Sequence, residues 1–143
     1  MNELHPPQPD ISKTPEKKEK MVELNIEPRV KERWDDFLKH CGPNAIALDG
    51  RVTGPTKFDL SKPAGNFNHH EEVDRAKTDA TCKQDFDALK SGALKNFQKD
   101  GKPFFRLFIE DCDGDISTCV TLFEMYCENP KLLLATFLLS LRP

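Results

Sequence analysis

The sequence lacks the long apolar runs of a membrane protein and the paired cysteines of a zinc ribbon. Its longest apolar run, residues 132–141, is interrupted by Thr136 and Ser140 and is far shorter than the roughly 20 residues that span a bilayer. The five cysteines form no C-x-x-C pair, which is the spacing typical of zinc ribbons. We therefore expect no membrane partner, and reduced thiols in the cytoplasm are the simplest interpretation of the cysteines.

An excess of positive charge and a secretory signal are also missing. The 21 Lys and Arg residues stand against 24 Asp and Glu residues, which gives a net charge of -3. Binding of duplex nucleic acid normally requires a basic face, so the composition gives no evidence for such a partner. The N-terminus, Met-Asn-Glu-Leu-His-Pro-Pro, has no basic region followed by an apolar one, and we predict a cytoplasmic protein.

The chain divides by composition into a polar segment and one domain. Residues 1–24 are rich in Pro, Lys and Glu and have almost no apolar side chains. Such a segment cannot bury enough surface to offset the entropy lost on ordering, so we predict a disordered tail over residues 1–24. The remaining residues, 25–143, suffice for a single domain with its own core.

Helix and strand patterns alternate along that domain. Apolar residues at helical spacing predict a helix over residues 29–41 and another from residue 80, with Asp79 as its cap. Continuous apolar runs predict strands at residues 45–48 and 104–109, and a third helix starts at Asp115. Residues 51–65, rich in Gly and Pro, are expected to form a loop. The alternation predicts an α/β fold with a short, mostly parallel sheet flanked by helices.

The last predicted helix, residues 131–141, is apolar on nearly every side. Helices of this kind are normally buried on all sides. Either this helix packs against a second subunit or another protein, or the domain is truncated at its C-terminus relative to a longer ancestor.

Acidic and imidazole side chains follow three of the expected strands. Asp49 follows the first, the pair His69 and His70 follows a short strand around Phe67, and Asp111 and Asp113 follow the strand at residues 104–109. Open α/β sheets bind ligands at the carboxyl ends of their strands, and imidazole with carboxylate suits Mn²⁺ or Zn²⁺. We therefore predict a metal site made of Asp49, His69, Asp111 and Asp113. The alternative is an exposed histidine pair, with residues 111–115 forming a polar turn and a helix cap.

A family resemblance strengthens the metal hypothesis. Asn68-His69-His70-Glu71, followed by Ala80-Thr81 at the start of a helix, resembles the third motif of the DHH-type phosphoesterases. These α/β enzymes typically use manganese and cleave pyrophosphate, polyphosphate, short oligonucleotides or cyclic dinucleotides. Asp49 looks like the family's acid at the end of an earlier strand, and Asp111-x-Asp113-Gly114 is similar to its first motif. Two departures stand out: Asn68 replaces the motif's Asp, and the first motif follows the histidine pair instead of preceding it.

The resemblance implies a phosphohydrolase, or a catalytically weak remnant of one. In that mechanism Mn²⁺, or another divalent metal, bound by Asp49, His69, Asp111 and Asp113 lowers the pKa of a water molecule that attacks a phosphate ester. His70, the implied catalytic residue, faces the phosphate and stabilises developing charge. The alternative is a non-catalytic interaction protein that docks a partner, or a second copy of itself, through residues 131–141.

Overall fold

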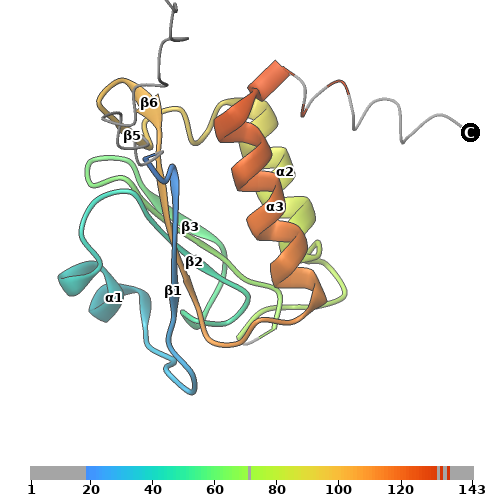
Figure 1. The fold of residues 1–143 in the computed structure, drawn as a ribbon. Coiled ribbons are helices and arrows are strands. Elements are labelled where there is room, and N and C mark those ends of the chain that lie inside the picture. The colour runs from blue at the N-terminus through green and yellow to red at the C-terminus, as the bar shows by residue number, and fades with distance from the viewer. Residues whose placement is uncertain (1–18, 71, 132, 134, 136–143) are drawn as a thin grey trace, which may run out of the picture.

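The computed structural model describes residues 19–70, 72–131, 133 and 135 of the chain (Figure 1). Its strands are β1 (Val22–Ile26), β2 (Ala45–Leu48), β3 (Lys57–Asp59), β4 (Ala64–Phe67), β5 (Gln98–Lys99), β6 (Lys102–Pro103) and β7 (Phe105–Ile109). Its helices are α1 (Trp34–His40), α2 (Thr81–Ser91) and α3 (Gly114–Glu128). The predicted α/β class is confirmed.

Five of the strands form one sheet, in the order β1-β7-β2-β4-β3. The strands β1, β7, β2 and β4 are parallel, and β3 pairs with β4 in the antiparallel direction. A separate pair, β5 and β6, forms a small antiparallel hairpin. The carboxyl ends of the four parallel strands therefore lie along one side of the sheet, the carboxyl edge.

Helices cover both faces of this sheet. Figure 1 shows α1 on one side, and α2 and α3 packed side by side on the other. Along β2, Ile46 and Leu48 face the core under α2 and α3, whereas Ala45 and Ala47 face α1. Burial on both faces explains why this strand is a continuous apolar run. The predicted strand at residues 45–48 matches β2, and the one at 104–109 matches β7 to within one residue.

The predicted N-terminal boundary at residue 24 is wrong. Residues 22–26 form β1, an edge strand that pairs with β7 in the register Val22 to Phe105. Its apolar residues alternate with polar ones, as expected of a half-exposed strand. The remainder of the predicted tail, residues 1–18, lies outside the described residues.

Two helix starts also differ from the sequence prediction. Helix α1 begins at Trp34 and not at residue 29, because Arg29 has a left-handed φ of 64° and the amide of Val30 closes a turn onto Glu27. Helix α2 has Ala80 at its N-cap with no side-chain cap, and the Asp79 carboxylate pairs with Lys83 one turn into the helix. The predicted loop at 51–65 contains the short strand β3 and the start of β4.

Most of the predicted C-terminal helix lies outside the described residues. Lys131, Leu133 and Ala135 are helical, and the Leu133 side chain is only 3% exposed, in the core formed with α2 and α3. The expectation of a truncated or self-associating C-terminus is not tested by these positions.

Candidate metal centre

The segments predicted to carry ligands leave the sheet at the carboxyl edge, from three neighbouring strands. Strand β2 lies between β7 and β4 and is parallel to both. The amide of Asp49 donates to the carbonyl of Phe67 at 2.8 Å, so the pairing of β2 with β4 continues to the residue before Asn68. This arrangement brings Asp49 and the histidine pair to adjacent positions.

A tight turn presents Asp49 at the end of β2. Asp49 and Gly50 both have left-handed backbone angles, with φ of 54° and 94°, a conformation that Asp tolerates better than most residues and that suits Gly. The amide of Arg51 closes the turn onto the carbonyl of Leu48 at 3.2 Å. The fully buried Arg51 side chain then anchors the turn through Glu32, with Nη1 and Oε1 2.7 Å apart.

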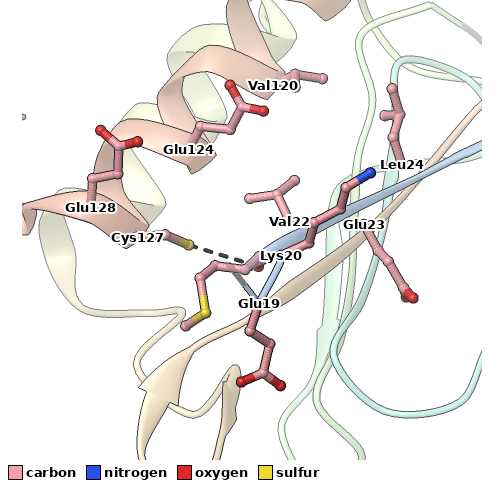
Figure 2. Close-up of a pocket in the computed structure, with 10 residues that line it drawn as sticks. Glu19, Lys20, Val22, Glu23, Leu24, Val120, Glu124, Cys127 and Glu128 are labelled. Atoms are coloured by element: carbon pink, nitrogen blue, oxygen red, sulfur yellow. Dashed lines mark hydrogen bonds between the residues drawn. The ribbon is translucent and has the colours of Figure 1, made fainter. Parts of the chain in front are cut away.

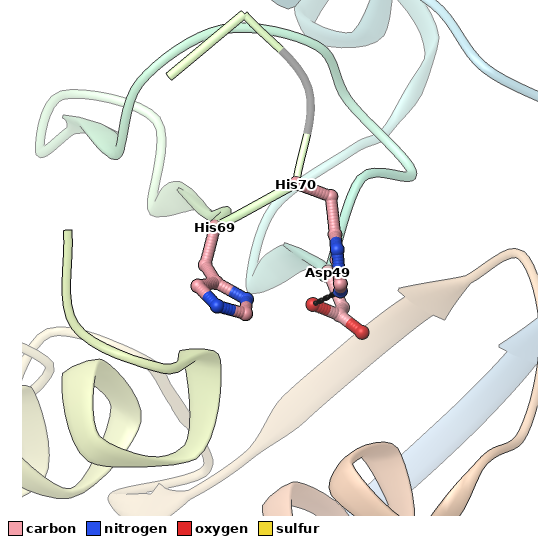
Figure 3. Close-up of side chains that lie close together, drawn as sticks. All are labelled: Asp49, His69 and His70. Carbon is pink, nitrogen blue, oxygen red and sulfur yellow. Dashed lines mark ion pairs between the residues drawn. The ribbon is translucent and has the colours of Figure 1, made fainter. Parts of the chain in front are cut away.

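Asp49, His69 and His70 form a compact cluster of metal-ligand types (Figure 3). One possible ligand atom from each lies within 4.8 Å of the others. The Nε2 atom of His70 lies 2.7 Å from Oδ1 of Asp49, and the two imidazole rings are 4.7 Å apart at their centroids. One carboxylate and two imidazoles fit Mn²⁺ or Zn²⁺.

Two further observations fit a ligand at this cluster. The Nδ1 atom of His69 is buried and has no hydrogen-bond partner among the described residues, and a buried polar atom without a partner calls for a bound water or ion. The hydroxyl of Thr81, the first residue of α2, donates to Oδ1 of Asp49 at 2.9 Å. This contact orients the carboxylate from the helix side, as supporting residues do around metal ligands.

Asn68, which stands where the resembling motif has Asp, has a structural role here. Its fully buried side chain accepts a hydrogen bond from the amide of His70 at 2.9 Å and donates one to the carbonyl of Gly54 at 2.9 Å. The amide group thus fixes the backbone that carries His70. A carboxylate lacks the donor that faces Gly54.

We therefore expect Asn68→Asp to destabilise the metal-free protein by about 1–3 kcal/mol, the usual cost of an unsatisfied buried group. Thermal unfolding of the metal-stripped protein measures this loss. An unchanged melting temperature would show that the contact with Gly54 contributes nothing.

Asp111 and Asp113 do not join the cluster, so the predicted set of four ligands is corrected. Together with Asp49 and His70 they line a hollow of about 300 Å³, but their carboxylates lie outside the group of mutually close ligand atoms. Asp113 is the N-cap of α3, and its Oδ1 accepts from the amide of Ile116 at 2.9 Å. The helix-cap alternative is confirmed for this residue.

Replacement of Asp113 with alanine should therefore act on stability and not on metal affinity. Loss of an N-cap typically costs about 1 kcal/mol, which denaturant unfolding can measure. A large loss of Mn²⁺ affinity in Asp113→Ala would instead make this carboxylate a ligand.

Asp85 was not foreseen from the sequence. It lies one helical turn after Thr81 in α2, is fully buried, and has no hydrogen-bond partner among the described residues for either carboxylate oxygen. Burial raises the pKa of Asp85 to about 8, against the opposing effect of the neighbouring Cys119 thiol, and the carboxylates of Asp115 and Asp49 act in the same direction as burial. In the sequence, the one indication that Asp85 is buried is its position beside the apolar stripe that contains Phe86 and Leu89.

Comparison of the chain with family models, with curated proteins and with solved structures found no significant match. Across the part of the chain that the structure describes, no helix combines the length and the apolar character needed to cross a membrane.

Proposed function

We propose that the protein binds one divalent metal ion through Asp49, His69 and His70 and acts as a DHH-like phosphohydrolase of low activity. The observation that carries this proposal is the cluster of three ligand atoms within 4.8 Å at the carboxyl edge. The resemblance of residues 68–71 to the DHH motif supports a phosphate ester as the substrate. His70, predicted only to face the phosphate, also becomes a metal ligand in this proposal.

The charge of the hollow makes metal dependence a requirement. Its walls carry the carboxylates of Asp49, Glu110, Asp111 and Asp113 and a single lysine, Lys31. This excess of negative charge attracts a cation and repels a free phosphate ester. An anionic substrate is therefore expected to bind only after the metal.

Residues of the chain have separate tasks in this proposal. Asp49, His69 and His70 would hold a divalent ion, which would supply the Lewis acidity that activates water at neutral pH. Thr81 holds the Asp49 carboxylate, and Asn68 holds the backbone of His70. Lys31, whose Nζ lies 3.6 Å from Glu110, stands on the wall of the hollow and would contact a non-bridging phosphate oxygen.

The donor set also explains why activity should be low. Three protein donors suit a single ion, and the carboxylate that the DHH motif offers at position 68 is replaced by an amide already used in structural contacts. Two-metal phosphatases clamp both the attacking and the leaving oxygens, and a single ion lacks one half of that clamp. The weak-remnant form of the hypothesis follows from this difference.

Hydrolysis of bis(p-nitrophenyl) phosphate and of pyrophosphate by the metal-stripped full chain, with and without Mn²⁺, tests the proposal. We expect slow, Mn²⁺-dependent release of product that is lost in Asp49→Asn and retained in Asp59→Asn, an exchange in the remote strand β3. Metal binding without any turnover would mean that the protein is an inactive remnant of such an enzyme. Turnover that persists in Asp49→Asn would overturn the assigned site.

A cytoplasmic location remains part of the proposal. All five cysteines are unpaired, and unpaired thiols are typical of a reducing compartment.

A further inference from the structure

A groove separate from the metal cluster runs between the edge strand β1 and helix α3 (Figure 2). It has a volume of about 1010 Å³. Its apolar lining comes from both elements, including Val22 and Leu24 of β1 and Val120 of α3. The groove is therefore a concave, partly apolar surface at the side of the sheet.

The groove exists because α2 and α3 do not cover the whole of the outermost strand, β1. Val22, Leu24 and Ile26 alternate along β1 and so share one face. Val22 packs against the core under α2 and α3, whereas Leu24 is 43% and Ile26 51% exposed. One further apolar segment beside α3 would cover Leu24 and fill the groove.

The rim of the groove is acidic. Glu124 and Glu128 of α3 line it, and Lys20 is the one basic residue among the lining residues. Glu19 and Glu23 also belong to the lining, but their carboxylates pair with Lys99 and Arg106. The complementary occupant is an apolar segment with positive charge and no acidic residues.

Residues 134–143 of this chain have that chemistry. They include Phe137, Leu138, Leu139 and Leu141, carry Arg142, and contain no Asp or Glu. Leu133, the residue directly before this segment, is only 3% exposed. It lies in the core of its own copy, beyond the end of α3 at Glu128. Because the groove runs beside α3 from Val120 to Glu128, the segment could enter the groove of its own copy only by turning back along α3.

We propose that the groove between β1 and α3 receives residues 134–143 of a second copy of the chain. The exchange is reciprocal in a two-fold dimer, so each copy both supplies the segment and receives it. No residue of the metal cluster lines the groove, so the two sites use different residues. The inference does not depend on the proposed enzymatic function.

Sedimentation equilibrium of the full chain over a wide range of concentrations tests the proposal. We expect a monomer–dimer equilibrium that a version ending at Ala135 no longer shows. Leu24→Lys should raise the dissociation constant about tenfold or more, because it removes an apolar contact and places a cation opposite Arg142. Ile26→Lys, on the same face of the same strand but outside the lining of the groove, is the matched control and should dimerise as the wild type does.

Cross-linking distinguishes the two copies. A photoreactive amino acid at position 24, in a mixture of isotopically light and heavy chains, should join peptides of residues 136–143 from light and heavy copies. Cross-links formed only within one copy would overturn the proposal, as would a monomer at every concentration. A dimer that survives both the shortened chain and Leu24→Lys would place the contact elsewhere and equally contradict it.

Discussion

Replacement of His69 with alanine is expected to weaken Mn²⁺ and Zn²⁺ binding by about a hundredfold or more. The substitution removes one of the three clustered donors and leaves only Asp49 and His70, whereas stable protein sites for these metals usually need at least three. Isothermal titration of the metal-stripped protein measures the change. The same variant should lose the rise in melting temperature that the metal gives to the wild type, because a ligand stabilises only the state it binds.

His40→Ala is the matched control for this prediction. His40 is also an imidazole, but it pairs with Glu32 at 2.7 Å at the end of α1 and lies outside the cluster. Its removal should leave metal affinity unchanged. Equal losses in both variants would mean that histidines bind the metal nonspecifically.

Exchange of Asp85 for asparagine is expected to stabilise the metal-free protein by about 1–3 kcal/mol at pH 7. A carboxyl buried at this depth opposes folding at pH 7, because the folded state must either hold the charge away from water or take up a proton. Burial raises the pKa of Asp85 from 3.8 to about 8, so between these values the folded state holds a proton that the unfolded state has lost. Stability therefore falls as pH rises through this window, and the asparagine variant lacks this loss.

Urea unfolding of the two proteins between pH 5 and pH 9 isolates the contribution of Asp85. The difference in free energy of unfolding, variant minus wild type, should grow with pH and level off above about pH 8. The pH dependence of groups that do not interact with Asp85 cancels in that difference. A constant difference over the whole range would show that the Asp85 carboxyl has an ordinary pKa and finds a partner.

The central strands could be predicted from the sequence because they are buried on both faces. Strand β2 and most of β7 are continuous apolar runs that no other element imitates. Strand β1 was missed because it lies at the edge, where Glu23 and Asn25 alternate with apolar residues directly after a Lys- and Glu-rich stretch. Its place in the sheet depends on pairing with β7, some 80 residues later, and local composition carries no trace of such a contact.

The sequence predicts those residues of the candidate site that directly follow a buried strand. Asp49 and the histidine pair follow buried strands, and parallel pairing brings those ends together. Asp113 carries the same signal, but the first turn of α3 uses its carboxylate as a cap, and the sequence favours neither role. Asp85, and the contact of Thr81 with Asp49, were missed because only the packed orientation of α2 turns that helix face toward the sheet.

The most direct test of the metal centre is an anomalous difference map from a crystal of the protein soaked in Mn²⁺. We predict one strong peak, about 2.0–2.3 Å from a carboxylate oxygen of Asp49 and from one ring nitrogen each of His69 and His70. A peak at Asp111 or Asp113 alone, or no peak in the hollow at the carboxyl edge, would contradict this prediction.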